Sequence, residues 1–170
     1  RAPKGVFNSP YNGSWSSSGM NPKFFELMPD MQDDTYATIG LRSSAKLSGV
    51  MRAEDPTMVQ DPSEPWDDFF TVDGATSLEV ATHTGGSWFV LRTAANGAPV
   101  EGKVILAQVT TSGDVSGSMN LQIFPLKHFV QIFEKNQQPH ESVHYSADCV
   151  AKGNGDVEIH VCRKCGCNPI

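Results

Sequence analysis

Alternating apolar and polar positions along residues 103–124 predict two β-strands joined by a tight turn. Apolar residues or glycine recur at every second position of Val115–Ile123, with polar residues between them. A period of two places one set on a buried face and the other in water. Residues 104–107 are wholly apolar, which is typical of a more deeply buried strand, and residues 111–114 supply turn formers. The pattern predicts a β-hairpin.

Other segments repeat this organisation of short strands and turns. The β-branched and aromatic residues of segment 35–41 predict a strand, and Gly40 within it indicates a β-bulge. Residues 78–80 and 87–91 predict a second hairpin with its turn at residues 84–86. Residues 42–75 read mostly as loop, and further short strands are expected at residues 129–133 and 157–161.

About seven or eight short strands separated by turns, with no long amphipathic helix, are typical of a β-sandwich. We therefore predict an all-β fold, an antiparallel β-sandwich of the immunoglobulin-like or jelly-roll-like kind. Residues 1–135 form this domain, which begins with an extended or looped segment (residues 1–23) rich in Asn, Ser, Gly and Pro. Residues 136–170 form a linker and a cysteine-containing C-terminal tail. The predicted core comprises Trp88, Val90, Ile105, Met119, Leu121 and Ile123.

Composition and charge narrow the classes of partner. Hydrophobic residues make up 39% and charged residues 19% of the 170 residues, a balance that favours strands and turned loops. The net charge of −6, without a cluster of basic and aromatic residues, argues against a nucleic acid as partner. No apolar run reaches the roughly 18 residues that a membrane span requires.

The four cysteines, Cys149, Cys162, Cys165 and Cys167, all lie near the C-terminus. An even number of crowded cysteines predicts disulfides and an oxidising compartment, with the pairing left open. The sequon at Asn12 fits secretion and marks a candidate glycosylation site. The chain begins at Arg1, without an initiator methionine or a signal-peptide pattern, so we expect a processed chain or part of a longer protein.

One motif has the spacing of a zinc hydrolase. His140, Glu141, Ser142, Val143 and His144 match H-E-x-x-H, in which two histidines hold zinc and the glutamate activates water. The motif works only on a helix, and the neighbouring residues are poor helix formers. In a strand the two histidines would lie roughly 13 Å apart at about 3.3 Å per residue. We therefore favour a surface linker as the interpretation of this motif. His160 and the last three cysteines could also hold zinc, but disulfides are the better-supported interpretation of those cysteines.

An acidic stretch between Ala53 and Ala75 contains no Lys or Arg. Calcium binds six to eight oxygen ligands at flexible geometry, so uncompensated carboxylates on a loop predict a weak calcium site. The spacing lacks the regularity of an EF-hand, and a solvated acidic loop is the plainer alternative. The candidate ligands are Asp55, Asp61, Asp67, Asp68 and Asp73.

Two tryptophans in loop-like segments, Trp15 and Trp66, are candidates for stacking on sugar rings. Acidic neighbours are available to hold hydroxyl groups or calcium. Each tryptophan is equally suited to anchor a loop on the core. Trp88 lies within a predicted strand and is expected to be buried.

Four segments in order, residues 14–22, 33–41, 86–91 and 104–108, resemble a β-rich module of large secreted or surface proteins of marine bacteria and algae. The likeness spans about residues 7–125 and carries no assigned active site. It implies an extracellular, multi-module setting in which such units have structural or adhesive roles.

Together these features predict a non-enzymatic, secreted β-sandwich module of an extracellular filament, coat or surface assembly. Its partners are other copies of itself or other extracellular proteins, joined through the segment 1–23, the strand at 157–161 and the cysteines. A carbohydrate-binding module, with calcium as its candidate cofactor, is the first alternative. A zinc-dependent hydrolase built on His140, Glu141 and His144 is the second.

Overall fold

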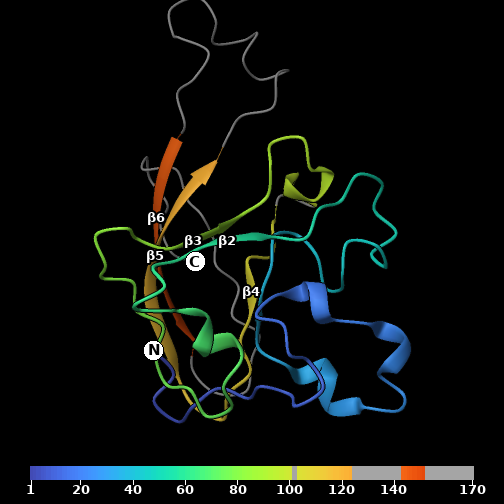
Figure 1. Cartoon of the computed structure of the whole chain (residues 1–170), viewed down its shortest axis with the longest axis horizontal. Helices are drawn as coiled ribbons and strands as arrows, with labels where there is room; N and C mark the ends of the chain where they lie inside the picture. The colour runs from blue at the N-terminus through green and yellow to red at the C-terminus, as the bar shows by residue number, and fades with distance from the viewer. Residues whose placement is uncertain (101–102, 124–142, 152–170) are drawn as a thin grey trace, which may run out of the picture.

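The computed structural model describes residues 1–100, 103–123 and 143–151 (Figure 1). Short 3-10 helices and short strands alternate with irregular segments along the chain. The 3-10 helices are η1 (Ser17–Gly19), η2 (Pro22–Phe24), η3 (Pro29–Asp33), η4 (Asp67–Phe70) and η5 (Ala95–Gly97). The strands are β1 (Tyr36–Ala37), β2 (Thr57–Val59), β3 (Ser87–Phe89), β4 (Ala107–Gln108), β5 (Val115–Ile123) and β6 (Val143–Ala151).

The strands form three separate antiparallel pairs: β1 with β4, β2 with β3, and β5 with β6. Two packed multi-stranded sheets, as the predicted sandwich requires, are not evident in the part of the chain that the structure describes. Frequent Gly, Pro and Ser residues limit the length of regular pairing, since each interrupts a ladder or favours a turn. The predicted strands at 129–133 and 157–161 lie outside the described residues.

The alternation predicted for β5 is confirmed at Val115, Met119 and Leu121 but not at Gly117, which is exposed, and the predicted hairpin is wrong. Val115 is buried and Met119 and Leu121 are half-buried, whereas the polar residues between them are exposed. The partner of β5 is β6, in a register that joins Val115 to Ala151 and Ile123 to Val143. A strand from the predicted tail therefore completes this ribbon.

Residues 104–108 instead lie along residues 36–40. β4 pairs with β1, and the backbone amides of Thr38 and Gly40 donate hydrogen bonds of 2.9 and 2.7 Å to the carbonyls of Leu106 and Ile105. The partner of residues 104–108 is thus the segment around β1. The second predicted hairpin is also wrong, because β3 pairs with β2 and not with residues 78–80.

The main core is an aromatic cluster, and its central member is Trp66. The Trp66 ring lies 5.7 Å from Trp15, 5.6 Å from Trp88 and 6.2 Å from Phe70, measured between ring centroids. Phe69 meets Phe70 edge to face at 5.2 Å. Such contacts add about 0.5–1.5 kcal/mol each beyond the burial of area. Trp88 belongs to this core, as predicted from its place in a strand.

The N-terminal segment 1–23 is irregular, as predicted, but it is not a loose arm. Phe7 lies between two other segments, since its amide donates to the Thr110 carbonyl and its carbonyl accepts from the Thr35 amide. The side chains of Ala2, Val6, Asn8, Ser9, Asn12, Ser16, Ser17 and Met20 are buried. Part of the segment therefore belongs to the core of its own chain, while other residues of it, Tyr11 among them, remain exposed.

Candidate functional site

The five candidate calcium ligands do not converge on one point. The Asp55 carboxylate accepts a 2.8 Å hydrogen bond from the Ala45 amide, and that of Asp73 accepts one of 3.0 Å from the Asn8 amide. Asp67 and Asp68 lie in the first turn of η4. Each carboxylate with a described partner thus supports local backbone. Across residues 1–100, 103–123 and 143–151, no three His, Cys, Asp or Glu side chains are grouped to hold a metal ion.

Asp61 shows the same local use of a carboxylate. It accepts hydrogen bonds from the hydroxyl and amide of Ser63 and from the hydroxyl of Thr84, which lower its pKa below the ordinary value. These contacts hold two neighbouring loops together on the surface.

Neither tryptophan forms the predicted open platform for a sugar. Trp66 is 4% exposed, and its Nε1 donates a 3.0 Å hydrogen bond to the Val59 carbonyl. Its faces are covered by neighbouring rings, so the Trp66 ring is not accessible for stacking on a sugar. Trp15 is half-buried and packs against the same cluster, which corresponds to the loop-anchor alternative.

Asn12 is buried rather than presented for glycosylation. The side chain is 5% exposed, and its Nδ2, the atom that would carry a glycan, donates a 2.5 Å hydrogen bond to Oδ2 of Asp34. Its Oδ1 accepts a 3.0 Å hydrogen bond from the Ser14 amide. A Cβ atom added at Gly19 would overlap Asn12 Oδ1, so this glycine allows the close approach. In the folded chain the Asn12 side chain therefore has a structural role, which differs from the predicted glycosylation site.

The zinc motif and the cysteines lie mostly outside the described residues. His140, Glu141 and Ser142 fall there, as do His160, Cys162, Cys165 and Cys167. Val143 and His144 begin strand β6, so the described part of the motif is not helical. Cys149 occupies the β6 position paired with Gly117 of β5.

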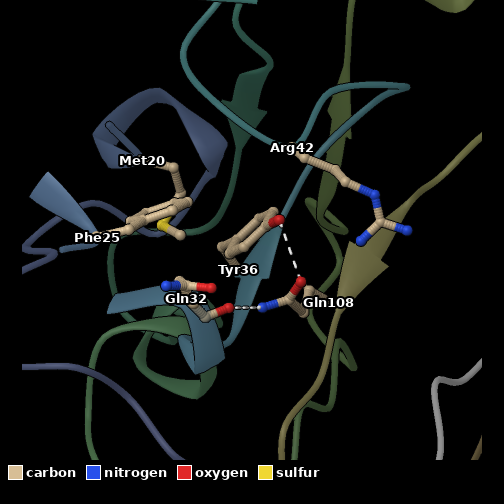
Figure 2. Close-up of a pocket in the computed structure, with 6 residues that line it drawn as sticks. All are labelled: Met20, Phe25, Gln32, Tyr36, Arg42 and Gln108. Carbon is tan, nitrogen blue, oxygen red and sulfur yellow. Dashed lines mark hydrogen bonds between the residues drawn. The ribbon is translucent and has the colours of Figure 1, made fainter. Parts of the chain in front are cut away.

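A cavity of about 200 Å³ lies beside Tyr36, and sequence reasoning did not anticipate it. Figure 2 shows the Tyr36 ring between Met20 and Phe25 on one side and Arg42 on the other. We call this cavity the Tyr36 pocket; it is lined by Met20, Phe25, Gln32, Tyr36, Arg42 and Gln108. Its volume is below the roughly 300–1,000 Å³ of sites for drug-sized ligands, so it suits one ring or one side chain.

Gln108 fixes one wall of the Tyr36 pocket. Its Nε2 donates hydrogen bonds of 2.7 Å to the Gln32 carbonyl and 2.9 Å to the Asp34 carbonyl (Figure 2 draws the first). Its Oε1 accepts a 3.3 Å hydrogen bond from the Tyr36 hydroxyl. With both ends of its amide engaged, Gln108 holds η3, β1 and β4 in one arrangement.

The polar groups that remain for a ligand are the Gln32 amide and the Arg42 guanidinium. Both side chains are exposed, and neither has a hydrogen-bond or ion-pair partner among the described residues. Met20 and Phe25 supply apolar side chains to the same pocket, with Gln32 beside Phe25 and Arg42 on the other side of the Tyr36 ring (Figure 2). The pocket thus combines the aromatic rings of Phe25 and Tyr36 with two polar side chains that can donate hydrogen bonds to a ligand.

Burial dominates the electrostatics beside the pocket. It raises the pKa of Asp34 to about 6, although hydrogen bonds from Asn12 and from the Ser9 amide favour the carboxylate. It also raises the pKa of Tyr36 to about 12, with Arg42 acting in the opposite direction. The Tyr36 hydroxyl therefore stays protonated near neutral pH and acts as a hydrogen-bond donor.

The sequence analysis did not predict the buried polar side chains around this pocket. Asp34, Thr35 and Thr38 are fully buried, and the Ser17 and Thr38 hydroxyls share a hydrogen bond of 2.9 Å. Their types are those of an ordinary turn-rich segment, and their partners lie far away in sequence. The one available signal was the density of Asn, Asp, Ser and Thr beside predicted strands.

No helix among the described residues is long and apolar enough to span a bilayer. Comparison with protein-family models, with curated proteins and with solved structures found no match for this chain.

Proposed function

We propose that this chain is a non-enzymatic, secreted structural or adhesive module of an extracellular filament, coat or surface assembly. One observation carries the proposal: the ribbon formed by β2 and β3 exposes Val59 and Phe89 on its outer face, beside Thr57 and Ser87, and has no further strand on either side in the described part of the chain. We place the assembly contact at this ribbon rather than at the N-terminal segment, where many side chains pack in the core.

The two faces of the ribbon differ sharply. Met58 and Trp88 are paired across the strands and pack on the aromatic core. On the opposite face, Val59 is 43% and Phe89 is 39% exposed, and Thr57 is paired with Phe89. A ribbon with exposed apolar residues and no third strand among the described residues is a template for pairing with another strand. The rigid inner face holds that template in place.

Sedimentation velocity over a range of concentrations tests this proposal. The wild-type chain is expected to associate, and Phe89→Thr with Val59→Thr is expected to shift it toward the monomer. Val72→Thr is the matched control, because Val72 is 51% exposed but follows η4. A wild-type chain that stays monomeric at every concentration, and shows no assemblies by electron microscopy, would contradict the proposal.

The Tyr36 pocket favours a second candidate function, a carbohydrate-binding module. The Phe25 ring offers an apolar face, and Gln32 and Arg42 offer free donors for hydroxyl groups. This pocket replaces Trp66 as the place where one sugar unit would bind, and it contains no carboxylate among its lining residues for calcium.

A glycan array probed with and without a chelator tests the second candidate. Binding that survives the chelator and is lost in both Phe25→Ala and Gln32→Ala supports it. Tyr11→Ala is the control, since Tyr11 is an exposed aromatic residue outside the pocket. An array without signal removes the candidate and leaves the assembly proposal unaffected.

A further inference from the structure

The segment of residues 41–53, which we call the basic loop, differs in charge from the rest of this acidic chain. It contains three cations, Arg42, Lys46 and Arg52, and no Asp or Glu, whereas the whole chain has a net charge of −6. All three cations are exposed. The basic loop is thus a local group of cations on an acidic protein; the two acidic residues that follow it, Glu54 and Asp55, are only partly exposed.

The same loop exposes aliphatic side chains between its cations. Met51 is 86% exposed, and Leu47 and Val50 are 42% and 43% exposed. The three residues lie within five positions of one another in the sequence, and Met51 has the highest exposed fraction among the large hydrophobic residues of the described part of the chain. Cations that flank exposed aliphatic residues are the arrangement by which peripheral proteins enter the interface of an anionic bilayer.

Hydrogen bonds define the shape of the basic loop. The Leu47 amide donates a hydrogen bond of 2.9 Å to the Ser44 carbonyl, and the Val50 amide donates one of 3.1 Å to the Ser48 hydroxyl. The Ala53 amide donates 3.2 Å to the Val50 carbonyl. Because the turns are closed by these bonds, the exposed positions of the aliphatic side chains belong to the fold.

The base of the loop is fastened at both ends. The Ala45 amide donates a hydrogen bond of 2.8 Å to the Asp55 carboxylate. The Asn96 side chain holds Glu54, since its Oδ1 accepts a hydrogen bond of 2.9 Å from the Glu54 amide and its Nδ2 donates one of 3.0 Å to the Glu54 carbonyl. The Ala95 amide donates 3.0 Å to the Arg52 carbonyl. In Figure 1 the loop projects at the right-hand side, in the cyan and teal part of the chain before β2. It is a supported projection rather than a free end.

We propose that the basic loop is an interfacial binding site for an anionic lipid bilayer. Met51, Leu47 and Val50 enter the interface, and Lys46 and Arg52 contact the lipid headgroups. Each cation near an anionic surface contributes about fivefold to the affinity, and the attraction is screened by salt. The site is separate from the β2–β3 ribbon, so the inference does not depend on the proposed assembly.

Co-sedimentation with vesicles tests the inference. The chain is expected to bind vesicles that contain phosphatidylglycerol and to bind pure phosphatidylcholine vesicles much more weakly, with the difference lost at high salt. The double variant Lys46→Gln with Arg52→Gln is expected to weaken binding on the order of 20-fold. Met51→Ser is expected to weaken it at least about tenfold.

Two control variants keep the test specific. Lys4→Gln removes an exposed cation beside Gly113, and Val72→Ser removes an exposed valine beside η4; both are expected to bind like wild type. Unchanged urea midpoints for all variants show that the fold is intact. Absence of binding to either vesicle, or equal losses in the control variants, overturns the proposal. A change in sedimentation mass in the loop variants, without any lipid binding, overturns it in favour of contact with a second copy.

Discussion

The side chains of Asn12 and Asp34 form a buried pair in which Asn12 Nδ2 donates a 2.5 Å hydrogen bond to Asp34 Oδ2. The other carboxylate oxygen of Asp34 accepts a hydrogen bond of 2.6 Å from the Ser9 amide. This pair joins the N-terminal segment to the residues that precede β1, directly beside the Tyr36 pocket. It connects the stability of the fold to the state of one carboxyl group.

Stability is expected to decrease as the pH rises from about 4 to about 6. The pKa of Asp34 is raised from 3.8 to about 6 by burial, so in this window the folded chain holds a proton that the unfolded chain releases. The unfolding free energy therefore falls by up to about 3 kcal/mol and then levels off. Urea unfolding across this range measures the effect.

Asp34→Asn is expected to remove this pH dependence, because the amide does not titrate. Asp33→Asn, which changes an exposed neighbour by the same charge, is expected to retain it. The pKa of Asp61 is lowered, so its effect on the unfolding free energy falls at a pH below this range and does not mask the effect of Asp34. A slope in Asp34→Asn equal to that of the wild type would show that another group is responsible.

Asn12 is expected to carry no glycan in the folded protein, even when the chain passes through a glycosylating secretory pathway. A glycan on Nδ2 would remove the donor to Asp34 and place a bulky group in the core. Intact-mass measurement before and after glycosidase treatment should show no change. A glycan mapped to Asn12 in soluble, cooperatively folding protein would disprove the buried position.

Gly40→Ala is expected to destabilise the fold far more than Gly49→Ala. Both glycines have positive φ angles, +69° and +74°, so both substitutions carry a backbone cost of about 1 kcal/mol. A Cβ at Gly40 would lie 2.0 Å from the Asn96 carbonyl oxygen, whereas Gly49 has open space. The difference between their urea midpoints measures this close approach, and equal midpoints would contradict it.

The register of β5 and β6 predicts a specific cross-link. Asn120 is paired with Ser146, so Asn120→Cys with Ser146→Cys is expected to form a disulfide, because directly opposed Cα atoms lie within bridging distance. Asn120→Cys with Tyr145→Cys, one position out of register, is the control. Peptide mapping by mass spectrometry distinguishes this bond from any that involves a natural cysteine. Preferential linking in the control pair would require a shifted register.

Local sequence patterns predicted those features that depend only on neighbouring residues. The alternation of Val115, Met119 and Leu121 appears as predicted, and Trp88 packs on the core. The described chain is built of short strands and 3-10 turns with no α-helix, which agrees with the absence of long amphipathic segments. Periodicity reports which face of a strand is buried, and that information is contained in the strand itself.

Strand partners and the pocket were decided by tertiary structure. Nothing in the alternation of β5 distinguishes residues 104–107 from residues 143–151 as its neighbour, because every strand offers the same backbone donors and acceptors. The Tyr36 pocket likewise needed Gln108 to meet residues that lie 72 to 76 positions earlier in the chain.

The sequence by itself determined that the chain is rich in turns, that Val115, Met119 and Leu121 share one face of β5, and that the net charge is acidic. Only the tertiary structure decided that Asn12 and Trp66 are internal, although both belong to segments that read as surface loop. The physical reason is that burial of a polar or aromatic group depends on partners distant in sequence. For Asn12 that partner is the Asp34 carboxylate, which satisfies its donor in the core.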